Sequence, residues 1–519
     1  MDTFVLGLIV VAYLLLTAFL GFLGYRKTTS SSDYLVGGRE MNPIVMSLSY
    51  GATFISASAI VGFGGISAAF GMGIQWLCFL NMAVGVVIAF IFFGLRTRRL
   101  GAKLNVSTFP QLLGSYYRSR SIRVFVAAII FLGMPLYAAV VMKGGAVFIE
   151  QIFRIDFNVA LLIFTLVVAA YVIAGGMKAV MYTDAMQACI MFICMLFLLF
   201  GVYQVLGMGF TEANQALTDI ADKVPDKYQA LGHQGWTRMP VAGSPQWFTL
   251  VTSLILGVGL GCLAQPQLVV RFMTVKSSKQ LNRGILVGCL FILITVGSIY
   301  HVGPLSNLFF LKTEGGVATE VVGDIDKIIP YFIDKAMPQW FSAIFMLCIL
   351  SASMSTLSSQ FHTMGAAAGS DIYGTYKPRS RGKLTNVIRL GILFTILVSY
   401  IICYMLPNDI IARGTAMFMG ICASAFLPAY FCALYWKRAT RRGALASMWT
   451  GTIVSIFCLV FLHEKESAAL GVCKLLFGRN VLIEAYPFPM VDPILFALPL
   501  SVIAIIVVSL LPRQQRISL

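Results

Sequence analysis

The sequence has few charged side chains for its length. Only 11% of its 519 residues are Asp, Glu, Lys or Arg, against about 25% in an ordinary soluble domain. Acidic residues are the scarcer kind, with 21 Asp and Glu against 38 Lys and Arg. This composition argues against a soluble globular protein.

Signatures of enzymes and ATP-driven pumps are also missing. The sequence contains no G-x-x-x-x-G-K-[ST] phosphate-binding segment and no H-E-x-x-H zinc motif. The 4 His are scattered, and the 11 Cys lie mostly within apolar stretches without metal-ligand spacing. We therefore expect the cysteines to be small buried apolar side chains. We find no catalytic pair that would face one cavity, and do not expect an enzyme.

Long apolar stretches make up most of the chain. Hydrophobic residues account for 59% of it, and a window of about 20 apolar residues crosses a membrane core about 30 Å thick. We therefore predict an all-α integral membrane protein of about 13 transmembrane helices. The predicted spans are 4–24, 43–70, 73–96, 123–149, 158–176, 182–207, 246–270, 281–302, 339–368, 385–406, 409–435, 443–462 and 491–511.

Basic residues cluster in alternate connections between these spans. The clusters are Arg26, Lys27 and Arg39; Arg96 to Arg120; Arg271 to Arg283; Lys377 to Lys383; and Lys437 to Arg442. This positive-inside pattern predicts a multi-pass membrane protein with an external N-terminus and a cytoplasmic C-terminus. The net charge of +17 therefore orients the chain in a lipid bilayer and does not imply a nucleic-acid partner.

Two of the predicted spans are interrupted by small and polar residues. Span 43–70 contains S-L-S-Y-G-A-T-F-I-S-A-S, and span 246–270 contains L-G-V-G-L-G-C-L-A-Q-P-Q. Five spans separate their starts, so the two would enter the membrane from opposite sides. Such a pair is typical of an inverted repeat with a binding site at the midplane. The alternative is that the glycines only allow close helix packing.

The span at 339–368 carries an unusually polar run, S-A-S-M-S-T-L-S-S-Q. Ser355, Ser358 and Ser359 share one helical face, and Thr356 lies beside it, one turn above Ala352. Hydroxyls and freed carbonyls are hard oxygen ligands that suit an alkali cation. Alternatively, each hydroxyl bonds back to a carbonyl one turn earlier.

Three charged residues fall at the ends of spans or inside them. Asp184 opens the span at 182–207, where an intramembrane carboxylate indicates a functional site and an acidic first turn equally complements the helix dipole. Lys143 could receive a substrate carboxylate or extend outward along its stem. Arg271 is expected to mark the cytoplasmic end of its span.

Four segments resemble signature regions of the sodium:solute symporter family. They are D-Y-L-V-G-G-R-E (33–40), Y-V-I-A-G-G-M-K-A-V-M-Y-T-D-A-M-Q (171–187), G-V-G-L-G-C-L-A-Q-P-Q-L-V-V-R-F-M (257–273) and F-L-P-A-Y-F-C-A-L-Y-W-K-R-A-T-R-R-G-A-L-A (426–446). The resemblance implies a single transport domain with a leading helix at 4–24, a five-plus-five inverted-repeat core at 43–435 and two trailing helices at 443–511. It also implies a location in the plasma membrane, as the inner membrane of a prokaryote, and we expect the protein to function as a monomer.

The resemblance to sodium/proline and sodium/sialic acid symporters implies candidate sodium ligands. The first sodium set comprises Ala52, Ile55, Ala352, Ser355 and Thr356. The second comprises Asp184, Ser355, Ser358 and Ser359. The substrate-binding candidates, chosen by position, are Phe54, Ser56, Ser58, Gln75, Tyr137, Lys143, Val258 and Cys262.

We therefore predict symport of a small polar solute, an organic carboxylate or amino acid, with Na⁺ as the coupling ion. Proline itself is doubtful, because Phe54, Val258 and Cys262 differ from the residues of the sodium/proline transporter. One alternative is a proton-coupled carrier of the same fold, which would titrate Lys143 or Asp184. A second is a substrate-sensing membrane receptor or a channel, although the loops are too short for a signalling domain.

Overall fold

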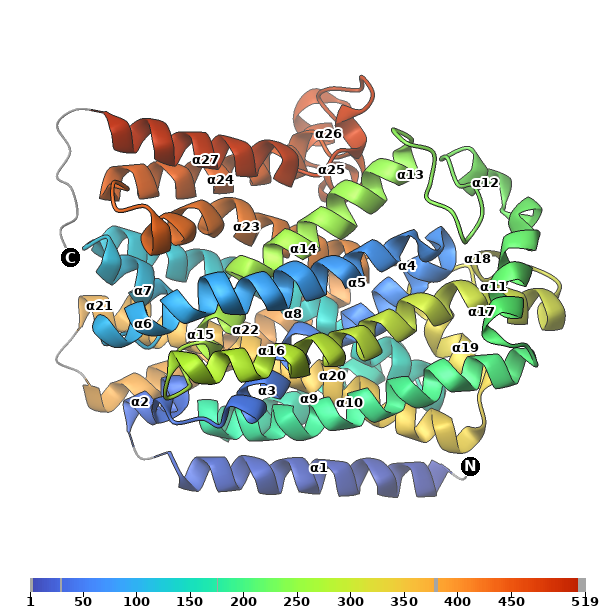
Figure 1. The fold of residues 1–519 in the computed structure, drawn as a ribbon, viewed down its shortest axis with the longest axis horizontal. Helices are drawn as coiled ribbons and strands as arrows, with labels where there is room; N and C mark the ends of the chain where they lie inside the picture. Colours follow the sequence, from blue (N-terminus) through green and yellow to red (C-terminus); the bar gives the residue numbers. More distant parts are fainter. Residues whose placement is uncertain (1–2, 29, 175, 378–380, 512–519) are drawn as a thin grey trace.

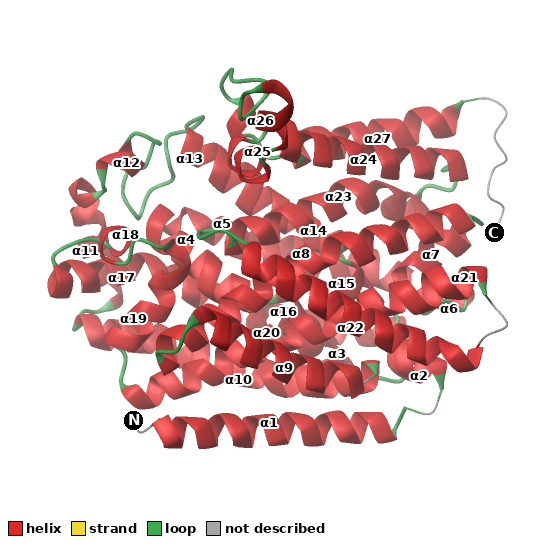
Figure 2. Ribbon diagram, turned by 180° about the vertical axis from the view of Figure 1, so that it is seen from behind, coloured by secondary structure: helices red, strands yellow, loops and turns green. Residues whose placement is uncertain are grey.

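The described part of the chain is a bundle of long helices running roughly parallel to one another (Figure 1). The computed structural model describes residues 3–28, 30–174, 176–377 and 381–511. Helix α1 (Thr3–Arg26) lies along one face of the bundle, and α24 (Arg441–Phe461) and α27 (Ile494–Leu510) lie along the opposite face. Over the described ranges no strand forms, and Figure 2 shows helices joined by loops throughout.

Each predicted window coincides with a helix or with a run of consecutive helical segments. Ten helices are long and apolar enough to cross a membrane, and a bent pair at 43–70 adds one further candidate. Two shorter apolar helices lie at Phe157–Ala170 and Ile494–Leu510. The predicted all-helical membrane class is confirmed, and the count of thirteen spans stays a prediction.

The predicted interruption of span 43–70 appears as a sharp bend. Helix α3 (Pro43–Phe54) begins with Asn42 as its N-cap and Pro43 at its first position, where proline's missing N–H is tolerated. It ends before Ile55, whose backbone is extended. The chain becomes helical again in the π-helical turn η2 (Ser58–Gly62) and α4 (Phe63–Phe70), which point 55° away from α3.

The span at 246–270 also changes direction. Its helical segments α13 (Pro245–Phe248), η6 (Thr249–Gly257), α14 (Val258–Gly261) and η7 (Cys262–Ala264) are consecutive. Gln265 is extended, and a new short helix, α15 (Pro266–Arg271), starts with Pro266 at its first position. A residue before proline disfavours the helical conformation, so the Q-P-Q sequence separates α15 from the preceding segments.

Two further long helices complete the surroundings of the first bend. Helix α10 (Met177–Leu206) packs against both α3 and α20 (Gln339–Ala366), and α20 in turn packs against α3 and α15. Nearly all of the polar run of α20 is buried. The bend in α3 and the hydroxyls of α20 therefore meet in the interior of the bundle.

Most of the longer connections gather at the end of the bundle where α1 begins, and the connection with α25 (Glu464–Leu470) and α26 (Val472–Phe477) lies beside the start of α27 (Figure 1). The connections at the end where α1 begins contain α11 (Phe210–Asp219), α12 (Asp226–Gln229), α18 (Ala318–Val321) and α19 (Ile328–Ala336). The last turn of α27 lies at the opposite end of the bundle. The start of α1 and the end of α27 therefore lie at opposite ends, as an odd number of crossings would require.

Further helices, both short and long, surround this interior. They are α2 (Ser31–Val36), α5 (Gln75–Met82) with η4 (Ala83–Gly94) and α6 (Leu95–Lys103), α7 (Phe109–Tyr116), α8 (Arg120–Phe153), α9 (Phe157–Ala174), α16 (Ser278–Ile292) with α17 (Ser298–Glu314), α22 (Arg381–Met405) and α23 (Ile411–Tyr435).

Candidate functional site

The bend at the end of α3 frees backbone carbonyls from helical hydrogen bonding, and hydroxyls of α20 donate hydrogen bonds to them. In a continuous helix, the carbonyls of Ala52 and Thr53 would accept N–H groups one turn later. Here the Ser355 hydroxyl donates to the Ala52 carbonyl at 2.8 Å, and the Thr356 hydroxyl donates to the Thr53 carbonyl at 3.1 Å. The two helices are thus joined through oxygen atoms at the bend.

All five residues of the first predicted sodium set are buried around this junction. Ser355 also donates to the Ala352 carbonyl at 3.2 Å, which brings Ala52, Ala352 and Ser355 together. Ile55 is the first residue beyond α3, and its N–H donates to Gly51 at 2.9 Å. The set offers carbonyl and hydroxyl oxygens without a carboxylate, a donor type that suits a hard monovalent cation.

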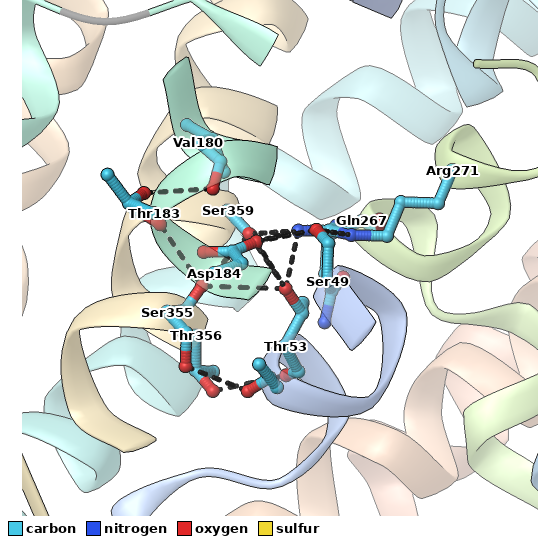
Figure 3. Close-up of polar contacts among 12 residues, drawn as sticks. Ser49, Thr53, Val180, Thr183, Asp184, Gln267, Arg271, Ser355, Thr356 and Ser359 are labelled. Atoms are coloured by element: carbon cyan, nitrogen blue, oxygen red, sulfur yellow. Dashed lines mark hydrogen bonds and ion pairs between the residues drawn. The ribbon is translucent and has the colours of Figure 1, made fainter. Parts of the chain in front are cut away.

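A fully buried ion pair lies next to this junction (Figure 3). The Arg271 Nη2 atom is 2.7 Å from Asp184 Oδ2, and neither side chain is exposed. The same nitrogen donates to Ser359 Oγ at 2.6 Å and to Thr53 Oγ1, while Arg271 Nε donates to Ser49 Oγ at 3.0 Å. The pair therefore ties together α3, α10, α15 and α20.

Asp184 Oδ2 accepts further hydrogen bonds from α3. Ser49 donates to it at 2.8 Å and Thr53 donates at 3.2 Å. Its other oxygen, Oδ1, has no hydrogen-bond partner within the described residues. A buried charge is retained only where it is paired and hydrogen-bonded, and on Oδ2 that requirement is met by Arg271 and two hydroxyls.

Arg271 is the last residue of α15, at the end of the predicted span, but its side chain lies inside the bundle. Its side chain is among the largest fully buried ones in the protein, because α15 is a separate short helix that directs its last residue inward. Its Nη1 atom also donates to the Gln267 carbonyl at 2.7 Å, one turn earlier. Sequence reasoning also missed Ser49 and Thr53, although their spacing of four residues would have placed both on one helical face.

The second predicted sodium set is only partly brought together. Ser359 meets the Arg271 guanidinium beside Asp184. The Ser355 hydroxyl instead donates to the Ala52 carbonyl of the first set. The Ser358 hydroxyl donates to the Ser355 carbonyl of its own helix at 3.1 Å. In this arrangement the oxygens around Asp184 surround a guanidinium nitrogen.

A small cavity lies on the other side of the bend. Its volume is about 20 Å³, enough for about one water molecule. The cavity is lined by Phe54, Ile55, Ser56, Ala59, Phe63, Asn81, Tyr137, Val258, Tyr300, Thr415 and Met419. Four predicted substrate residues, Phe54, Ser56, Tyr137 and Val258, are among these. A solute would therefore require the surrounding helices to separate.

Three other substrate candidates lie outside the lining of the cavity. Cys262 is buried and its thiol contacts the Gly259 carbonyl at 3.1 Å. The buried Ser58 hydroxyl has no hydrogen-bond partner within the described part of the chain. Gln75 donates to the Gly297 carbonyl at 3.1 Å. No pattern in the sequence pointed to Tyr300 or Met419, which come from α17 and α23, whereas Phe63 belongs to the second half of the broken span itself.

Lys143, the last substrate candidate, caps a neighbouring helix. Its Nζ donates to the carbonyls of Leu406 and Pro407 at 3.2 and 2.5 Å, where α22 ends. The start of α23 is held similarly, because Asp326 Oδ2 accepts the N–H groups of Ile410 and Ile411 at 3.1 and 3.3 Å. Lys143 therefore belongs to a polar cluster at the end of the bundle where α1 begins.

The carboxylates of this outer cluster belong to Asp324, Asp326 and Asp409. Burial, reinforced by the charge of Asp324, raises the pKa of Asp326 to about 7, although Lys143 and the N–H of Ile411 oppose the shift. Burial also raises the pKa of Asp324. Asp409 accepts the Ile325 N–H at 2.7 Å, so the short helix η9 (Ile325–Lys327) is fixed to the start of α23. Gly65 of α4 lies so close to Ile325 that a Cβ there would stand 2.0 Å from its carbonyl oxygen.

Comparison with known proteins gives a consistent set of matches. The model of the sodium:solute symporter family matches residues 34–451. The chain is 28% identical over 493 residues to the sodium/pantothenate symporter of Haemophilus influenzae, covering 92% of this chain and 96% of that protein. It is also 28% identical over 480 residues to an osmoregulated proline transporter of Bacillus subtilis, covering 91% of each.

Among solved structures, the fold is similar to a substrate-bound, outward-open sodium-coupled sialic acid symporter. The TM-score is 0.75 at 16% identity, and the match covers 99% of both chains. A nucleobase-cation-symport-1 family transporter in a closed conformation matches with a TM-score of 0.52 at 12% identity, covering 93% of this chain and 96% of that one. These likenesses establish the transporter fold.

Proposed function

This chain belongs to the sodium:solute symporter family, and we propose that the junction of α3 and α20 is the site through which it couples sodium to its solute. Membership makes it a sodium-coupled symporter of small organic solutes in the membrane, and not an enzyme. The proposal rests on the hydrogen bond that the Ser355 hydroxyl donates to the freed Ala52 carbonyl, at 2.8 Å.

The proposed sodium ligands are the oxygens of Ala52, Ile55, Ala352, Ser355 and Thr356. Their oxygens are hard donors in a buried setting. Sodium would replace the hydrogen bonds that join Ser355 and Thr356 to α3, because each hydroxyl would turn a lone pair toward the ion. Binding of the ion would therefore hold the bend of α3 against α20.

The proposed solute is a small organic carboxylate or amino acid. The cavity beside the bend is lined by aromatic rings and by a few hydroxyl and amide groups. Because the first N–H groups of a helix have no partner within it, the N–H groups of Ser56, Ala57 and Ser58 could receive a carboxylate at the midplane. The related proteins are named for pantothenate and proline, which both carry a carboxylate.

Lys143 is the weaker candidate for a carboxylate ligand. Its ammonium group lies on the carbonyls at the end of α22 and outside the cavity lining. The start of the helical turn after the bend is therefore the better candidate for the carboxylate, one of the two roles that the sequence left open for this lysine.

Alternating access follows from the small size of the cavity. The cavity holds about one water molecule in the described conformation, so the solute must enter and leave through conformations in which the helices separate on one side.

We propose an external N-terminus and a cytoplasmic C-terminus, on the basis of the alternating basic clusters, and function as a monomer. One sodium moving through 100 mV contributes about 2.3 kcal/mol, which supports roughly fortyfold accumulation of solute.

Uptake into proteoliposomes tests this function. Labelled proline, pantothenate and glucose would each be offered under an inward sodium gradient and under an equal potassium gradient. Sodium-dependent uptake or competition by a carboxylate supports the proposal. Uptake that follows a proton gradient and ignores sodium would contradict the coupling ion, and exclusive uptake of glucose would contradict the solute class.

A further inference from the structure

We propose that the guanidinium of Arg271 stands in the place of a second sodium ion at Asp184, so that one sodium accompanies each solute. This inference rests on the proposed function, and it concerns the number of ions rather than the identity of the coupling ion. It follows from the contacts around one nitrogen atom.

The Arg271 Nη2 atom has an environment made of the oxygens that a cation would use. Asp184 Oδ2 lies at 2.7 Å, Ser359 Oγ lies at 2.6 Å, and Thr53 Oγ1 also accepts from this nitrogen. One carboxylate and two hydroxyls form a hard oxygen set. Asp184 and Ser359 are members of the second sodium set predicted from sequence, and here both contact a positively charged side chain (Figure 3).

Charge balance opposes a second ion while Arg271 stays in place. Asp184 and Arg271 are both fully buried and neutralise one another. A sodium ion among the same oxygens would put two positive charges around one carboxylate without water to screen them, and uncompensated charge in such a setting is strongly unfavourable.

The remaining hydroxyls of the predicted second set are engaged elsewhere. Ser355 donates to the Ala52 carbonyl in the first sodium set, and Ser358 donates within its own helix. Asp184 Oδ1 has no hydrogen-bond partner within the described residues, so the carboxylate keeps one oxygen available. Removal of the guanidinium would therefore leave an anion able to attract sodium.

Thr53 connects the guanidinium to the first sodium set. Its carbonyl accepts from Thr356 at 3.1 Å, and its hydroxyl lies 3.0 Å from the Ser359 hydroxyl and contacts Arg271. The two sites are thus neighbours joined by one residue of α3. A positive charge fixed at Asp184 completes the polar network beside the first site without a second dissociable ion.

Two measurements on the full chain test the proposal. The first is the ratio of labelled sodium to labelled solute entering proteoliposomes through the wild type. The second is the sodium dependence of thermal stability for the wild type, for Arg271→Gln and for Arg271→Lys, with Arg123→Gln as the matched control. Arg123 pairs with Asp371 at 3.1 Å outside this site.

We expect one sodium per solute and a Hill coefficient near one for the wild type, Arg271→Lys and Arg123→Gln. We expect a steeper sodium dependence for Arg271→Gln, because a second ion then reaches Asp184. Two sodium ions per solute in the wild type would overturn the proposal, and so would an unchanged Hill coefficient in folded Arg271→Gln. If that variant does not fold, the wild-type ratio decides alone. Solute uptake without any sodium entry would instead refute sodium coupling itself.

Discussion

The guanidinium of Arg271 lies 2.7 Å from the carboxylate of Asp184, and both side chains are completely buried. The two residues come from α15 and α10, and Ser49 and Thr53 of α3 contact both of them. The ion pair therefore depends on the relative placement of three helices. Two of these, α3 and α15, are the helices that end or begin at the interruptions in their spans.

Removing one partner of this ion pair should destabilise the protein more than removing both. Asp184→Asn or Arg271→Gln alone leaves a buried charge without its counterion, which costs about 3–5 kcal/mol. The double variant carries no uncompensated charge and should recover much of that loss. Thermal unfolding in potassium-containing buffer measures the double-mutant cycle.

Arg123→Gln provides the comparison for this cycle. The Arg123 side chain is 26% exposed beside Asp371, so its removal should cost less than the removal of Arg271. Additive losses in the Asp184 and Arg271 double variant would contradict the direct coupling of the two charges.

Enlarging Val258 should separate solute binding from sodium binding. Val258 lines the cavity of about 20 Å³, and a phenylalanine there would occupy the remaining space. Val258→Phe should therefore abolish solute uptake, while sodium still stabilises the purified protein. Uptake measurements and thermal unfolding with and without sodium distinguish the two effects.

Leu16→Phe is the control for this variant, because Leu16 is exposed on α1 and lies outside the cavity lining. Normal uptake by Val258→Phe would show that the solute binds elsewhere. A loss of sodium stabilisation in the same variant would show that the cavity and the ion site are not separable.

The contribution of Asp326 to the free energy of unfolding should decrease as pH rises through about 7. The folded-state pKa of Asp326 is raised to about 7 from an ordinary value of 3.8. A raised carboxyl pKa stabilises the folded state below the unfolded pKa, and that contribution is lost as pH rises through the folded pKa. The loss amounts to about 1.4 kcal/mol of unfolding free energy for every tenfold difference between the folded and unfolded acid dissociation constants.

Asp326→Asn should flatten this pH dependence between pH 4 and 8, since the amide oxygen can still accept from Ile410 and Ile411. Asp222→Asn is the control, because Asp222 is exposed. Thermal unfolding across the pH range is the measurement. An equal slope in the wild type and Asp326→Asn would show that Asp326 does not cause the pH dependence, and would point to Asp324, whose pKa burial also raises.

The membrane class could be predicted from local patterns in the sequence, whereas the candidate sodium set came from the resemblance to a family. Apolar windows separated by basic clusters predict the helices. The polar runs of spans 43–70 and 339–368 are visible in the sequence, but the resemblance to the family is what put Ala52 and Ser355 into one candidate set, and their oxygens lie 2.8 Å apart in the structure. Their roles as sodium ligands stay a prediction.

The positions of Arg271 and Lys143 could not be derived in this way. Both depend on how helices distant in sequence pack together. Arg271 follows an apolar run and so resembles the end of a span, but Pro266 restarts the helix and Asp184 supplies a counterion from α10. Lys143 has a long stem, and only the position of the carbonyls that end α22 determines where its ammonium group lies.

Selective stabilisation by sodium tests the central claim most directly. Purified wild type, Thr356→Ala and Ser351→Ala would be unfolded thermally in sodium and in equimolar potassium. Ser351 is a buried hydroxyl on the same helix that donates to Tyr13 at 3.2 Å, away from the bend. We predict that sodium raises the unfolding temperature of the wild type and Ser351→Ala, and that Thr356→Ala loses most of this effect. Equal unfolding temperatures for the wild type in sodium and in potassium would contradict a sodium site at the junction of α3 and α20.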